Sequence, residues 1–228
     1  MRIMSRLKRE KITCPVCSNE KEIAIWASVN VDINPETKEQ ILNREFFNWR
    51  CDNCGQKFHL VYSCLYHDMS NKLMIYLIAN NPKNSKAELA NLQQLSDQMR
   101  MFFGSEYRLT AVFSENELIE KIKIVDCGKD YRIIELYKVI LRNELFKTRP
   151  NYKVEHIYFD SSDDKEFFVF LDNEGKCLAT EFRQELYHGL EEDFMDKVGK
   201  YTANRFDVID LDWAVNVLND VWSDDDFI

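Results

Sequence analysis

Glycine is scarce in this chain, and the short patterns that usually mark an active site are missing. Only six glycines occur among 228 residues, which disfavours a fold built on glycine-rich nucleotide-binding turns. The sequence has no G-x-S-x-G, no H-E-x-x-H and no recognisable order of histidine and cysteine. It therefore assigns no catalytic residue and no organic cofactor, and an enzyme stays open only as an alternative with its site in residues 85–228.

Long apolar runs are also missing. No stretch approaches the ~20 apolar residues that a membrane-spanning helix needs, so we expect no membrane association. The basic residues up to Lys11 lack the apolar core of a signal peptide, and we expect them to form a frayed, solvated terminus. The acidic segments 160–164 and 223–226 lack the glycine and the glutamate of an EF-hand loop, which favours solvated loops or tails there.

Two cysteine pairs are the strongest signal in the sequence. They are Cys14-Pro15-Val16-Cys17 and Cys51-Asp52-Asn53-Cys54, the second followed by Gly55. A two-residue gap lets neighbouring thiolates bind one ion, and two pairs supply the four ligands of a tetrahedral zinc site. Pro15 stiffens the first turn, and Gly55 permits a tight exit from the second. We therefore predict Cys14, Cys17, Cys51 and Cys54 as metal ligands.

The kind of metal site follows from the number and the spacing of the cysteines. Four cysteines leave no open coordination position, which indicates structural rather than catalytic zinc. A redox dithiol would need only one pair, usually at the start of a helix that follows a strand. Iron stays as the alternative, because rubredoxin-like sites also use two such pairs. Since 33 residues separate Cys17 from Cys51, we expect an insertion between the pairs.

Two histidines lie near the second pair and could replace a cysteine as ligand. They are His59 and His67. Alternation along the segment 58–62 places His59 on the face opposite Phe58, Leu60 and Tyr62, which favours a surface imidazole on a strand.

Seven cysteines, four of them in a thiolate metal site, fit a reducing compartment. We therefore expect a cytoplasmic protein.

The pattern of residue types predicts an α+β protein with two parts. Residues 1–80 read as a zinc-ribbon-like β module, whose turns carry the cysteines. Strands are expected at 23–31, 46–50, 58–62 and 74–78. Asn34 and Pro35 predict the start of a helix that runs toward Asn43 and fills the insertion.

The second expected part, residues 85–228, is a helix-rich α+β region. The polar segment 80–85 is the predicted boundary. Helices are expected from Ser85, from Ser114 to Gly128, over about 130–146, and twice more at the end of the chain. Strands are expected at 107–113, 154–159, 167–171 and 177–182, the last two joined by the hairpin turn 172–175.

Charge is distributed unevenly along the chain. The formal net charge is −9, and residues 81–228 hold 19 basic against 30 acidic side chains. Residues 1–80 hold 11 basic against 9 acidic ones. Because the acidic part repels phosphate backbones, extensive nucleic-acid binding is disfavoured.

Residues 10 to 80 resemble the CpXC domain family, a bacterial and archaeal group with two cysteine-pair motifs. The likeness rests on 13–17, 25–31 and 51–54, and continues through 58–59, 65–68 and 72–77. The family usually has proline inside the second pair, where this chain has Asp52. The resemblance implies a zinc-ribbon-like module and no established activity.

These observations favour a zinc-binding, non-catalytic interaction protein with an unknown protein partner. A nucleic-acid-binding zinc ribbon is the second interpretation. An enzyme with its site in residues 85–228 is the third.

Overall fold

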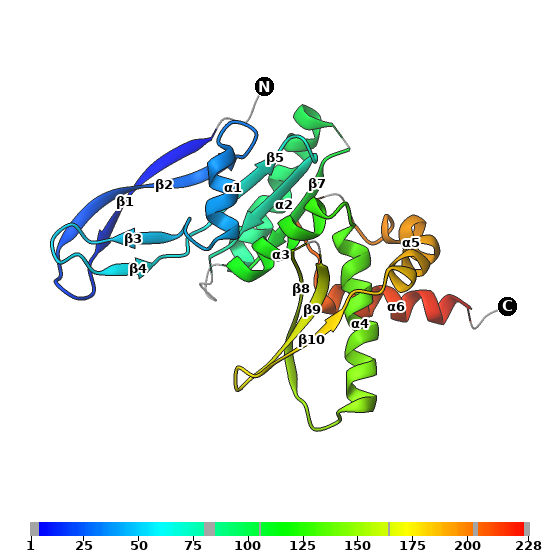
Figure 1. Ribbon diagram of the computed structural model, residues 1–228. Coiled ribbons are helices and arrows are strands. Elements are labelled where there is room, and N and C mark those ends of the chain that lie inside the picture. The colour runs from blue at the N-terminus through cyan, green and yellow to red at the C-terminus, as the bar shows by residue number, and fades with distance from the viewer. Residues whose placement is uncertain (1–4, 80–84, 105, 164, 203–204, 226–228) are drawn as a thin grey trace. The chain divides into compact units, whose positions relative to one another are not determined.

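The computed structural model describes residues 5–79, 85–104, 106–163, 165–202 and 205–225 (Figure 1). Helices and strands are mixed along the chain, so the predicted α+β fold class is confirmed. The chain divides into two compact units. The first unit holds Met1–Glu115 and Asn204–Asp207, and the second holds Asn116–Ala203 and Val208–Ile228.

Two β-hairpins open the first unit (Figure 1). Strands β1 (Arg6–Thr13) and β2 (Glu20–Asn30) pair antiparallel along their length. Strands β3 (Asn48–Arg50) and β4 (Lys57–His59) form a small sheet of their own. The frayed terminus expected up to Lys11 is wrong from Arg6 onward, because β1 pairs with β2; residues 1–4 lie outside the described part of the chain.

Helix α1 (Pro35–Leu42) lies between the two hairpins in the sequence, as predicted. Asn34 occupies the N-cap position and Pro35 the first turn, but the Asn34 side chain caps no backbone N–H. Instead, the Thr37 hydroxyl donates a hydrogen bond of 2.6 Å to the Asn34 carbonyl. The buried Ile41 anchors the helix on the core.

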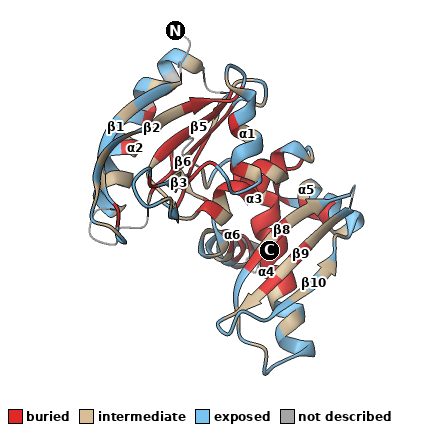
Figure 2. Ribbon diagram, turned by 60° about the vertical axis from the view of Figure 1, so that its left-hand side comes forward, coloured by how far each residue is buried: buried red, intermediate tan, exposed pale blue. Residues whose placement is uncertain are grey.

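A six-stranded sheet with the order β1-β2-β5-β6-β7-β11 forms the body of the first unit. Its remaining strands are β5 (Cys64–Asp68), β6 (Leu73–Leu77), β7 (Arg108–Val112) and β11 (Asp207–Val208), of which only Asp207 belongs to the first unit. β5 and β6 are buried on both faces apart from Tyr76 (Figure 2). Helix α2 (Ser85–Phe103) connects β6 to β7, which pair in parallel, and a parallel pair requires such a crossover.

This sheet groups residues differently from the sequence expectation. The boundary expected at 80–85 falls mostly on 80–84, which lie outside the described residues. Because β7 pairs with β6, the segment 85–115 belongs to the first unit. The strand expected at 58–62 is shorter than predicted, because β4 ends at His59. Strand β5, which follows it, was not predicted.

The second unit combines helices with a three-stranded sheet. Its helices are α3 (Glu115–Asp126), which begins on the last residue of the first unit, α4 (Tyr131–Thr148), α5 (Gln184–Val198) and α6 (Leu211–Asp225). Its strands are β8 (Val154–Ser162), β9 (Lys165–Asp172) and β10 (Cys177–Glu181), in the order β10-β9-β8. The predicted hairpin turn between β9 and β10 is present, with Gly175 in the left-handed region at φ 78°.

The core of the second unit lies between α4 and one face of this sheet. Phe159, Phe168 and Tyr137 are all less than 2% exposed. Phe168 lies 4.8 Å from Tyr137 and 5.8 Å from Phe159, measured between ring centroids. Such pairs add stabilisation beyond the area they bury. Tyr137 of α4 therefore packs on the sheet where β8 and β9 contribute Phe159 and Phe168.

Candidate metal centre

The two cysteine pairs lie at the tips of the two hairpins, and the two turns have the same hydrogen-bond pattern. In the first turn, Cys14 N–H donates to the Asn19 carbonyl (2.9 Å), and Ser18 N–H donates to the Cys14 carbonyl (2.9 Å). In the second turn, Cys51 N–H donates to the Gln56 carbonyl (2.9 Å), and Gly55 N–H donates to the Cys51 carbonyl (2.8 Å). Each hairpin therefore presents its two thiols in the same way.

Both turns end on a residue in the left-handed region. Gly55 has φ 73°, which confirms the tight exit predicted for the second turn. Ser18 takes the equivalent place in the first turn with φ 55°. A left-handed backbone costs glycine little and any other residue more. The sequence gives no sign of this conformation at Ser18, because glycine is absent there.

The structure brings the four predicted cysteines together. The Sγ atoms of Cys14 and Cys54 are 3.7 Å apart, as are those of Cys17 and Cys51. All four Sγ atoms lie within 4.8 Å of one another. A tetrahedron with metal–sulfur bonds of about 2.3 Å has edges of about 3.8 Å. The four sulfurs therefore fit the tetrahedral coordination of one ion. Among the described residues, they are the only group of three or more histidine, cysteine or acidic side chains close enough to share a metal ion.

Neighbouring groups give the thiols unequal proton affinities. The Asn53 amide donates to Cys17 Sγ at 3.4 Å, and this bond, with one from the Asn19 backbone, lowers the pKa of Cys17 to about 6. A backbone bond from Gln56 lowers the pKa of Cys54, but desolvation and the adjacent thiols outweigh it and raise that pKa to about 12. Four sulfurs so close together cannot all ionise without a cation, so a bound ion would displace the protons that remain.

Asp52 stands where the family usually has proline, and it has a partner. Its carboxylate forms an ion pair with Lys21 Nζ, at the start of β2. This pair connects the second turn to the first hairpin. Both side chains are more than a third exposed, so the pair contributes little stability by itself.

The two nearby histidines lie outside the cysteine cluster. His59 ends β4, where its Nδ1 lies 3.0 Å from Asn48 Oδ1 and its Nε2 lies 2.9 Å from Glu115 Oε2. Its side chain is 41% exposed, as expected for a surface imidazole. His67 is fully buried in β5, which the sequence did not predict.

No helix in the described part of the chain is long and apolar enough to cross a membrane.

No curated protein and no solved structure matches this chain significantly. The family model described as "CpXC protein" matches residues 12–138. The match covers more than half of the chain and extends past residue 80, through β7 and α3 into α4. The chain belongs to the CpXC protein family.

Proposed function

We propose that this protein is a non-catalytic interaction protein whose hairpin tips are joined by one structural zinc ion. Cys14, Cys17, Cys51 and Cys54 would hold the ion. The observation that carries the proposal is the fit of their sulfurs to a tetrahedron of metal–thiolate dimensions. When bound, zinc would supply charge neutralisation and a cross-link, and four thiolates would leave it no open position for substrate.

The need for a cross-link follows from the size of the second hairpin. β3 and β4 have three residues each and pair only with one another. An isolated two-stranded hairpin is marginally stable in water. The stacked rings of Trp49 and Phe58, 5.4 Å apart, add one contact across this pair. Joining its tip to the longer β1–β2 hairpin would hold the small sheet in place.

A protein partner is favoured over nucleic acid by the way the basic side chains are used. Lys8 lies 3.0 Å from Glu10, and Arg9 lies 3.3 Å from Glu22. These neighbouring carboxylates reduce the attraction of β1 for phosphate. Apolar side chains such as Leu7 and Val16, by contrast, are 53% and 65% exposed on the same hairpin. The unpaired cysteines and the thiolate site fit the cytoplasm, which we propose as the compartment.

Elemental analysis of freshly purified protein tests the metal assignment. We expect one zinc per chain, and loss of the metal in the Cys51→Ser variant. Cys177→Ser is the matched control, because this exposed cysteine lies in β10 and should leave the zinc content unchanged. Iron in equal amount, or metal-free protein, would contradict zinc. Copurification from native cells, with identification of bound proteins and nucleic acids, tests the interaction role.

A further inference from the structure

Strand β10 is one of the two outer strands of the sheet in the second unit. Its pairing with β9 shows which backbone groups point away from the sheet. Phe182 N–H donates to the Glu166 carbonyl, and Asp172 N–H donates to the Lys176 carbonyl. Hydrogen-bonded pairs recur at every second residue of an antiparallel ladder. The backbones of Leu178 and Thr180 therefore face β9.

The backbones of the alternate residues, Cys177, Ala179 and Glu181, face outward. All three residues are exposed. No hydrogen bond to their outward N–H and C=O groups is found within the described part of the chain. The edge therefore presents three donors and three acceptors at the spacing of a β-ladder, which is a template for a further strand.

The opposite edge of the same sheet is different. There, Phe159 N–H of β8 points outward and donates to the carboxylate of Glu120 on α3. Two residues on, Ser161 N–H donates to the Asp160 carboxylate at 2.7 Å. Both side chains occupy backbone groups that an added strand would need. Two outward donors of the β8 edge are thus occupied, whereas the outward donors of β10 are not occupied by any described residue.

A groove for side chains lies beside the β10 edge. Helix α4 and strands β9 and β10 line an open cavity of about 220 Å³. Its apolar wall consists of Leu141, Leu145, Phe170 and Leu178. A second cavity of about 480 Å³ is lined by residues 165–167 and 179–182. Ala179 and Thr180 line both cavities, so both lie along β10.

We propose that β10 binds an extended peptide segment of a partner protein as a fourth strand, with an apolar side chain in the cavity beside α4. Backbone pairing supplies affinity in this mode, and pockets for alternate side chains supply specificity. The site belongs to the second unit and does not depend on the metal centre.

The surroundings of the cavity restrict the side chain that it accepts. Glu144, which lines the cavity, is already paired, because the Arg183 guanidinium donates to both of its carboxylate oxygens at 3.0 and 2.8 Å. A charged residue of the peptide would lose its hydration against the leucine and phenylalanine wall. A second copy of β10 is a poorer occupant, because it would present polar Thr180 together with Leu178 on one face.

Selection from a random linear-peptide display library, with the full-length metal-loaded chain as target, supplies the probe. The selected peptide is then synthesised and titrated. We expect Ala179→Pro to weaken its binding at least about tenfold, since proline removes an outward donor. The fold should persist, because that N–H lies outside the ladder and proline is tolerated there. Thermal unfolding and the zinc content check this.

Two further variants keep the test decisive if Ala179→Pro fails to fold. Leu145→Glu places a charge in the cavity and should weaken binding at least about tenfold. Phe146→Glu is the matched control, because Phe146 is the next residue of α4, is 71% exposed and lines neither cavity. Failure to select any peptide, or equal binding by wild type and Leu145→Glu, would overturn the proposal. So would dimerisation of the wild type that Ala179→Pro abolishes.

Discussion

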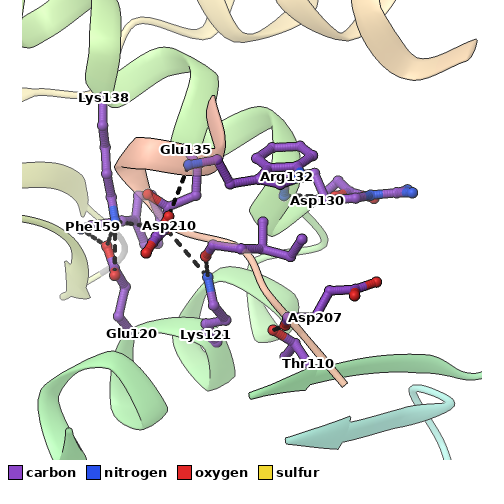
Figure 3. A network of polar contacts seen from close by, with 12 residues as sticks. Thr110, Glu120, Lys121, Asp130, Arg132, Glu135, Lys138, Phe159, Asp207 and Asp210 are labelled. Carbon is purple, nitrogen blue, oxygen red and sulfur yellow. Dashed lines mark hydrogen bonds and ion pairs between the residues drawn. The ribbon is translucent and has the colours of Figure 1, made fainter. Parts of the chain in front are cut away.

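Lys138 Nζ lies 2.8 Å from the carboxylate of Glu120, and the two side chains are only 5% and 3% exposed (Figure 3). Lys138 also lies 3.0 Å from Glu135, which in turn lies 3.2 Å from Lys121. Lys121 donates to the Ile209 carbonyl at 2.8 Å. Two positive and two negative charges thus cancel inside the core of the second unit. Burial alone would lower the pKa of Lys138, but the two carboxylates outweigh it and raise that pKa.

Lys138→Met should therefore destabilise the protein strongly. The substitution leaves Glu120 buried without its cation, and breaking one partner of a buried pair typically costs about 3–5 kcal/mol. Lys147→Met, on an exposed position of the same helix, should cost less than about 1 kcal/mol. Urea unfolding followed by circular dichroism measures both. Similar losses in the two variants would show that the buried network adds no stability of its own.

His67 should make the protein sensitive to mild acid. Its Nδ1 faces the amide nitrogen of Asn30 at 3.4 Å, and its Nε2 lies 3.1 Å from the Tyr107 hydroxyl. This arrangement suits a neutral ring, since the Asn30 amide donates to Nδ1. Burial lowers the pKa of His67, and the opposing effects of Asp32 and Asp68 do not cancel this.

The sign of the effect follows from proton binding. Below pH ~6.5 the unfolded chain protonates this histidine while the folded protein resists, so stability present above that pH is lost as the pH falls. The loss can reach about 1.4 kcal/mol per pH unit between the folded and unfolded pKa values. Urea unfolding at several pH values between 7 and ~5 gives the free energy of unfolding as a function of pH. Its slope against pH should be smaller for His67→Gln than for the wild type. His156→Gln, at an exposed position, should keep the wild-type slope; equal slopes in all three would contradict the assignment.

Asn53→Ala should weaken metal binding without removing a ligand. The Asn53 amide donates to Cys17 Sγ, and partners of ligands typically change metal affinity about 10- to 100-fold. Competition with a chromophoric chelator measures the change. Gln56→Ala is a control in the same turn, because the Gln56 side chain donates to the Lys57 carbonyl rather than to a sulfur. Unchanged affinity in Asn53→Ala would show that this hydrogen bond is not made in the loaded protein.

The sequence predicted the hairpin turns well because their determinants are local. The two-residue cysteine gap and Gly55 specify a turn from within five residues, and Pro35 favours the start of α1, although the Asn34 side chain makes no cap there. The buried network could not be predicted in this way. Lysine and glutamate are usually exposed, and their burial here depends on distant partners: Lys138 of α4 donates to Glu120 of α3, and Lys121 of α3 donates to the Ile209 carbonyl.

Strand β1 is a second element that its own sequence does not predict. Its eight residues include only two large apolar side chains, Leu7 and Ile12, so their pattern indicates no buried face. Residues 6–13 form a strand because β2, on the other side of the first cysteine turn, pairs with them. Pairing of this kind depends on the neighbouring segment more than on intrinsic propensity.

Cys51→Ser should unfold the hairpins and leave most of the helical signal. The short β3 and β4 strands depend on the energy of metal binding, whereas half of the residues of α4 are buried within the second unit. Far-UV circular dichroism gives the helical content, and amide exchange locates the loss. The exposed Cys177→Ser should behave as wild type in both. Loss of the whole helical signal in Cys51→Ser would show that the two units fold together.

The protein should bind generic DNA or RNA only weakly at physiological salt. Arg50, next to the second cysteine turn, donates its Nε to the Gly55 carbonyl and so has a structural role. Few basic side chains remain for phosphate contacts, and residues 81–228 carry an excess of acidic groups. Binding through few contacts is weak and falls steeply as salt rises. Fluorescence polarisation with labelled duplex DNA and single-stranded RNA at ~0.15 M salt measures it. Submicromolar affinity there would contradict this expectation and favour the nucleic-acid-binding ribbon over the protein-interaction role.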